Sequence, residues 1–233
     1  MKPRGQERLN LSKVEKGKEM ASSEAMTKWL LDKSSVLLAL KRFFNGELFN
    51  PEGISLLRCS LRNLAHWHQD QAFSLGLGFI ERPVSGDEEY DFTRLFIGPG
   101  RLPAPPYGSA YCSTERLLMQ EETLAVRRYY QRYGLASKME GSQPDDFLPV
   151  ELEFLVYLLT MAGRHLELGG KAWKTTLNAY GRFHQRHLLP WIEPFAKDIA
   201  LHASTNLLKG IGMVLAATLP LEVSEWADCD AGP

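Results

Sequence analysis

Apolar residues recur at steps of three and four along most of this chain, and one face of an α-helix repeats with that period. The clearest stripe runs through residues 29–44 and stops at Asn45-Gly46, a pair that favours a helix end. Neither a strand-length alternating run nor a hairpin signal interrupts the pattern. We therefore predict an all-α protein folded as a single multi-helix bundle. Helices are expected at residues 29–44, 56–67, 115–133, 150–161, 172–191 and 199–217.

Two of these predictions depend on particular residues. The helix over residues 115–133 would end at Gly134, and the helix after Pro149 would use the Asp145 and Asp146 carboxylates as N-caps. The apolar face of the first of these helices would consist of Leu117, Leu118, Leu124, Val126, Tyr129 and Tyr130.

The two ends of the chain lack helical periodicity. Residues 1–23 are polar, and residues 221–233 carry four carboxylates and end in Gly-Pro. We expect both to be flexible tails, so that residues 24–220 form the one helical domain.

A segment rich in proline and glycine interrupts the helical pattern. Residues 94–111 read RLFIGPGRLPAPPYGSAY, with four prolines and three glycines in eighteen positions. A long irregular connection inside a helical bundle is usually functional or a hinge, and proline stiffens it. We expect a hinge at about residues 97–111 between two helical halves.

Composition and charge exclude several classes of protein. The chain is 44% hydrophobic and 24% charged, with a formal net charge of -1, so it lacks the basic excess of a nucleic-acid binder. Its three cysteines form no CxxC pair, which argues against a disulfide framework and a cysteine zinc site. The longest apolar run, residues 210–221, is too short to span a bilayer. We expect a cytoplasmic protein without stable membrane insertion and with no nucleic-acid partner.

The sequence contains no recognisable catalytic motif. Neither of its two Gly-Lys pairs is followed by the Ser or Thr that a phosphate-binding loop needs: Gly17-Lys18 precedes Glu19, and Gly170-Lys171 precedes Ala172. The GxSxG pattern of a serine nucleophile elbow is absent. We therefore expect no enzyme activity and no cofactor.

A two-histidine metal site is the alternative. His184 and His187 are three residues apart and could share a helix face, as the ligands of a small metal-dependent hydrolase would. The plainer interpretation is that His187 is a core or interface histidine.

Four sequence blocks stand out along the chain: FTRLFIGP at residues 92–99, PPYGSAY at 105–111, QPDDF with ELEF at 143–154, and the stretch from Phe183 through His187 to Trp191. In their order and spacing these blocks resemble the redox-enzyme maturation chaperones of the TorD/DmsD type. The resemblance covers about residues 30–215.

The resemblance implies a function and a partner. Members of the family are all-helical cytoplasmic chaperones, without enzyme activity of their own, that bind the twin-arginine signal peptide of a molybdopterin-dependent oxidoreductase precursor. They assist cofactor insertion and folding before export. Such a peptide joins a cationic start to an apolar run, so its receptor needs an apolar groove with carboxylates near one end.

Two sets of residues would form this groove. The wall would consist of Leu95, Phe96, Gly98, Pro99, Pro106, Tyr107, Tyr111, Phe147, His187 and Trp191. The acidic end would consist of Asp145, Asp146, Glu151 and Glu153. Core packing remains the alternative for the aromatic residues, and helix capping for the carboxylates.

This chain departs from the family pattern at two positions. Gln143 stands where the family typically has glutamate, and Phe147 stands where it has histidine. Roles of that acid or imidazole, including any part in an effect of a guanine nucleotide, are therefore not carried over. A structural subunit of an oxidoreductase complex remains a further alternative, and the hinge is compatible with a monomer or a domain-swapped homodimer.

Overall fold

The computed structural model describes residues 4–67, 70–113, 115–137 and 143–218, and it is helical through most of them. No strand occurs in these ranges, where the one β-type pairing recorded is a bridge between Tyr107 and Phe147. The prediction of an all-α bundle is confirmed. The elements are α1 (Arg4–Phe44), α2 (Pro51–Ala65), α3 (Gln71–Ile80), α4 (Glu88–Phe96), α5 (Ser109–Cys112), α6 (Glu121–Gln131), α7 (Leu148–Glu167), α8 (Ala172–Phe183), a π-helical turn (His184–Leu188), α9 (Leu189–His202) and α10 (Asn206–Thr218).

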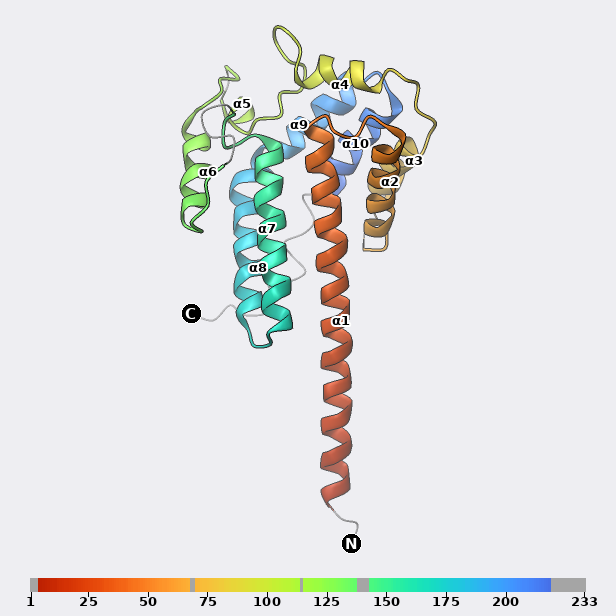
Figure 1. Cartoon of the computed structure of the whole chain (residues 1–233), viewed down its shortest axis with the longest axis vertical. Helices are drawn as coiled ribbons and strands as arrows, with labels where there is room; N and C mark the ends of the chain where they lie inside the picture. The colour runs from red at the N-terminus through yellow and green to blue at the C-terminus, as the bar shows by residue number, and fades with distance from the viewer. Residues whose placement is uncertain (1–3, 68–69, 114, 138–142, 219–233) are drawn as a thin grey trace.

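The long helix α1 runs along the centre of the bundle, and its N-terminal part extends beyond the other helices (Figure 1). Its C-terminal part packs against α7 and α2. The helix α7 pairs with α8, while α10 packs against both α3 and α9. The short helix α4 lies across one end of the bundle (Figure 1). This arrangement brings α4 close to the turn between α9 and α10.

The apolar stripe predicted over residues 29–44 is the part of α1 that faces the core. All seven of its apolar positions are buried: Trp29, Leu30, Val36, Leu37, Leu40, Phe43 and Phe44. The aromatic rings of Phe44 and Phe96 meet edge to face with centroids 5.4 Å apart, and Phe195 of α9 lies 5.6 Å from Phe44. Such pairs stabilise beyond their buried area, so this cluster joins α1, α4 and α9.

Several helix boundaries differ from the sequence prediction. Residues 4–23 belong to α1, although no helix was predicted there, and the expectation that they form a flexible tail remains a prediction. The predicted helix 115–133 is α6 alone, because Arg116 (φ 53°) and Met119 (φ 57°) take left-handed conformations that a right-handed helix excludes. The predicted helix over residues 199–217 is broken at Ala203, whose ψ of 138° is extended.

Other elements were missed or capped differently. The helices α3 and α4 were not predicted, and a π-helical turn divides the helix expected over residues 172–191. The N-cap of α7 is Phe147, which makes no side-chain capping bond, so the prediction that Asp145 and Asp146 cap this helix is wrong.

The proline-rich segment is irregular but anchored. The Ala104 N–H donates to the Leu95 carbonyl at 3.3 Å, and the Leu148 N–H donates to the Pro106 carbonyl at 3.0 Å. Ala104 and Pro106 are buried. A hinge at about residues 97–111 and the limits of the domain remain predictions, and the expected acidic tail lies outside the described residues. Within those residues, each helix is too short or too polar to cross a membrane.

Candidate functional site

Three of the four sequence blocks meet at one place, where the chain segment before α7 lies against the segment that leads into α5. Tyr107 and Phe147 pair as the isolated bridge, and their rings stack with centroids 5.2 Å apart at 28°. The Gly108 N–H donates to the Asp146 carbonyl at 3.0 Å. On the other side, Tyr111 stacks on Trp191 of α9 at 6.0 Å and 21°.

Asp146 lies at the centre of this junction. Its Oδ2 accepts a 2.6 Å hydrogen bond from the Ser109 N–H, and its Oδ1 accepts a 2.8 Å bond from the Thr123 hydroxyl. The side chain is buried, so both oxygens are used inside the protein. One carboxylate therefore ties α5, α6 and the start of α7 together.

Asp145 holds α6 from the same side. Its Oδ2 accepts a 2.7 Å bond from Arg127 Nε, and its carbonyl accepts a 3.2 Å bond from the Tyr130 hydroxyl. The Asp145 side chain is 2% exposed, whereas that of Arg127 is 37% exposed. The charge of this aspartate is thus directed at a residue of its own chain.

The two glutamates of the expected acidic end differ from each other. Glu151 is fully buried, and burial together with the charge of Asp146 raises its pKa well above the usual value. Glu153 is exposed and forms a 3.1 Å ion pair with Lys41 of α1. The expectation of an accessible acidic end is therefore wrong for Asp145, Asp146 and Glu151, whose side chains are buried.

The expected apolar wall is also largely closed. Gly98, Tyr107, Tyr111 and His187 are half-buried, and Pro99 is exposed. These residues, with Glu153, are the members of the predicted site that remain accessible. Packing against the core buries the others, so the expectation of an open wall is wrong for Leu95, Phe96, Pro106, Phe147 and Trp191.

The two positions that depart from the family pattern both contact Tyr107. The Tyr107 hydroxyl donates a 3.1 Å hydrogen bond to Oε1 of Gln143, and its ring stacks on Phe147. Burial raises the pKa of Tyr107, so the hydroxyl keeps its proton and remains a donor at neutral pH. An amide and a phenyl ring thus hold this tyrosine at the edge of the junction.

Tyr111 belongs to a second accessible group. Its hydroxyl donates a 3.1 Å bond to Oδ2 of Asp198, which also accepts a 2.8 Å bond from Nη2 of Arg116. The Arg116 guanidinium lies 5.1 Å from the centre of the Tyr111 ring. We call Tyr111, Arg116 and Asp198 the latch, because they fasten the loop before α6 to α9.

The two histidines of the metal-site alternative lie in different surroundings. His184 is buried, and burial together with the nearby charge of Lys33 lowers its pKa to about 4. His187 packs against the rings of Tyr129 and Phe183, with centroids 5.4 and 5.1 Å away. Within the described parts of the chain, no three His, Cys, Asp or Glu residues lie together as metal ligands would.

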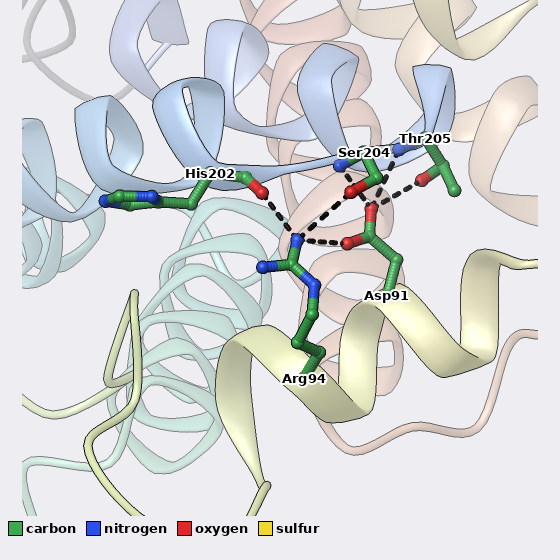
Figure 2. A network of polar contacts seen from close by, with 5 residues as sticks. All are labelled: Asp91, Arg94, His202, Ser204 and Thr205. Atoms are coloured by element: carbon green, nitrogen blue, oxygen red, sulfur yellow. Dashed lines mark hydrogen bonds and ion pairs between the residues drawn. The ribbon is translucent and has the colours of Figure 1, made fainter.

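A polar network that the sequence reasoning missed joins α4 to the α9–α10 turn (Figure 2). Asp91 Oδ2 accepts the N–H groups of Ser204 at 2.7 Å and Thr205 at 2.8 Å, as well as the Thr205 hydroxyl. Its Oδ1 accepts a 2.6 Å bond from Arg94, which also donates to the His202 carbonyl. The available signal was position, since Asp91 directly precedes the block at residues 92–99 and Arg94 lies in it.

The site is defined by a helical bundle whose sequence blocks meet around two buried aspartates. Comparison with known proteins identifies the family to which such a bundle belongs. The family model described as "Nitrate reductase delta subunit" matches residues 75–197, more than half of the chain. The chain therefore belongs to this family, that of the TorD and DmsD chaperones, as the resemblance of its sequence blocks predicted.

Individual relatives carry chaperone names. "Chaperone protein TorD" of Photobacterium profundum is 31% identical over 195 residues, covering 71% of this chain and 89% of that protein. "Tat proofreading chaperone DmsD" of Salmonella paratyphi A is 32% identical over 127 residues, 54% of this chain and 55% of the relative. A "Probable Tat proofreading chaperone DmsD" of Haemophilus influenzae is 25% identical over 140 residues, 60% of this chain and 62% of the relative. The match thus spans a little over half the length of these DmsD relatives.

Proposed function

We propose that this protein is a cytoplasmic, system-specific chaperone for a molybdopterin-dependent oxidoreductase. It binds the twin-arginine signal peptide of the enzyme precursor and assists cofactor insertion and folding before export. The observation that carries this proposal is the 31% identity over 195 residues to a protein named as the chaperone TorD. The convergence of three family blocks on one junction supports it, because it places the most characteristic residues together.

The proposed contacts with the peptide are the accessible residues of the junction. Tyr107 and Tyr111 present aromatic rings that need little ordering on binding. Pro99, in the block outside the junction, is proposed as a further contact because it is exposed. The buried aspartates act through these residues, since they hold the backbone on which the rings stand. Binding is non-covalent, and ordering the peptide offsets much of the gain from burying its apolar run. We expect a releasable affinity in the micromolar range or somewhat tighter, which suits transfer of the client to the next step.

Isothermal titration with a synthetic twin-arginine signal peptide tests the proposal. The wild-type protein should release or absorb heat with saturable binding, and Tyr107→Ala should weaken it. The control is the same peptide with both arginines replaced by glutamine. An absence of binding to every twin-arginine peptide from the host's molybdoenzymes would refute the proposed function.

The description of the matching family model favours a second candidate, a structural subunit of an oxidoreductase complex. The two candidate functions predict different binding partners in a purification. A subunit would co-purify in a fixed ratio with the mature enzyme, whereas a chaperone would be found with the precursor alone. Gel filtration of the same preparation distinguishes a monomer from a domain-swapped homodimer.

A further inference from the structure

Large apolar side chains are exposed at unusual density in the loop that leads into α6. Among the described residues from position 23 on, thirteen such side chains are exposed, and four of them lie within residues 117–124. Leu117 is 48% exposed, Leu118 43% and Met119 65%, in direct succession. We call Leu117, Leu118 and Met119 the strip. Exposed apolar residues scattered singly are ordinary, but a contiguous group commonly marks an interaction surface.

The backbone holds the strip in a specific conformation. Arg116 and Met119, which flank the two leucines, are the only non-glycine residues with positive φ in the described parts of the chain. Such conformations are unfavourable for these residue types and persist where surrounding contacts impose them. Here the latch holds Arg116, the Ser113 hydroxyl accepts the Leu117 N–H at 3.1 Å, and Gln120 donates to the Leu118 carbonyl at 2.9 Å. The strip is thus presented on an ordered loop.

Glutamates border the strip on both sides. Glu115 precedes it, and Glu121 and Glu122 follow it at the start of α6. Glu121 pairs with Arg128, but Glu115 and Glu122 form no ion pair with any residue that the structure describes. Arg116, the one cation in this stretch, is engaged by Asp198. The surface therefore combines exposed apolar side chains with uncompensated negative charge.

The strip is directly connected to the junction of the family blocks. Thr123, one residue after Glu122, donates a hydrogen bond from its hydroxyl to Asp146. Tyr111 holds the other end of the loop through the latch. The buried Asp146 thus positions the first turn of α6, and with it the glutamates that border the strip.

We propose that the strip and its bordering glutamates bind the part of the client's signal peptide where the cationic start adjoins the apolar run. This inference rests on the proposed function and identifies where the cationic start and the apolar run of the peptide bind. Leucine and methionine side chains bury the apolar run, and Glu115 and Glu122 face the cationic side chains. Charge complementarity selects this occupant, because an apolar segment without cations gains nothing from the glutamates.

One variant of the strip, one variant of its bordering glutamates and one matched control test the inference in the full-length protein. The variant Leu118→Ser/Met119→Asn removes apolar surface, and asparagine tolerates the left-handed backbone at position 119. The variant Glu115→Gln/Glu122→Gln removes the charge alone. The control, Leu31→Ser/Leu168→Ser, removes two leucines that are 66% and 84% exposed on other parts of the molecule. The probe is the twin-arginine signal peptide, with Kd measured by titration at two salt concentrations.

We expect the Leu118/Met119 variant to weaken binding about tenfold or more, while the control changes Kd less than about twofold. The Glu115/Glu122 variant should weaken binding at low salt and flatten its salt dependence. If the wild type binds the peptide and the strip variants bind it equally well, the inference is wrong while the proposed function stands. If the wild type binds no twin-arginine peptide, both fail. If the strip variants change only the oligomeric state on gel filtration, the strip is a contact between copies and the inference is overturned.

Discussion

The Oδ2 atom of Asp146 accepts a 2.6 Å hydrogen bond from the backbone N–H of Ser109, 37 positions earlier in the chain. The bond is buried, and it links the segment before α7 to the first turn of α5. A charged acceptor with a buried N–H donor is among the stronger hydrogen bonds in proteins. The aspartate is therefore part of the framework beneath the candidate site.

Replacing this aspartate should reduce stability. In Asp146→Ala, the Ser109 N–H and the Thr123 hydroxyl lose their acceptor inside the protein, so we expect unfolding to become easier by about 2 kcal/mol or more. Urea unfolding followed by circular dichroism measures the change. The matched control is Glu153→Ala, which removes an exposed carboxylate and should change stability by less than about 1 kcal/mol. Equal effects of the two substitutions would contradict the structural role of Asp146.

Gly108 should not tolerate a side chain. A Cβ atom at this position would lie 3.0 Å from Nε1 of Trp191, which is buried and cannot move away freely. We expect Gly108→Ala to destabilise the protein by about 1–3 kcal/mol, the usual range for overpacking. The control is Gly163→Ala in α7, where a Cβ meets nothing within 4 Å and should be neutral or stabilising. A fully stable Gly108→Ala protein would show that the indole has room to shift.

Glu151 predicts a pH dependence of stability. The pKa of Glu151 is raised in the folded protein. Its contribution to the free energy of unfolding is therefore fully favourable below the pKa that it has in the unfolded chain, and this contribution is lost as pH rises toward the pKa that it has in the folded protein. Glu151→Gln, which stays neutral, should match the wild type near pH 4 and become more stable than the wild type as pH increases. Melting temperatures measured from pH 4 to 8 test this expectation. The exposed Glu153→Gln should follow the wild type throughout.

The Asp91 network should stabilise the bundle and depend on acid. Burial alone would raise the pKa of Asp91, but hydrogen bonds from Thr205, Arg94 and Ser204 outweigh it and lower the pKa. Its stabilisation is therefore present above the unfolded pKa and is lost as pH falls through the folded one. Asp91→Ala should destabilise the protein by about 2 kcal/mol or more at pH 7, because two backbone donors lose their acceptor. The exposed Asp87→Ala is the control, and denaturant unfolding at pH 7 and pH 3 is the measurement.

Periodicity predicted the fold class because the helices bury continuous stripes. The apolar stripe on α1 was predicted correctly from Trp29 to Phe44. The N-cap of α2 likewise depends only on neighbouring residues, since the Asn50 side chain accepts a 2.7 Å hydrogen bond from the Gly53 N–H. The same reasoning wrongly placed Leu117 and Leu118 on the apolar face of a helix over residues 115–133. Their spacing fits a helix, but the left-handed conformations of Arg116 and Met119 depend on the latch to α9 and have no local signature.

The sequence pointed to three blocks that meet in the structure, but it did not predict how deeply their residues are buried. Three of the blocks do come together, yet Asp145 and Asp146 were expected as the accessible acidic end of a groove or as helix caps, and both are buried. Their burial depends on partners at Ser109, Thr123 and Arg127, which lie 18 to 37 positions away in the sequence. Residue types show that a carboxylate needs a partner, but only the fold shows whether that partner is internal.

The hydrogen bonds from Ser204 and Thr205 to Asp91 span 113 and 114 positions of the chain. During synthesis, α4 leaves the ribosome long before the segment that completes this network has been made. The Asp91 carboxylate must therefore stay hydrated at least until residues 204 and 205 have been synthesised, since closing a loop of this length is among the slower steps of folding. A nascent chain stalled before residue 203 lacks α10, so the face of α4 that α10 contacts would be open to proteases, and synthesis through α10 would protect it.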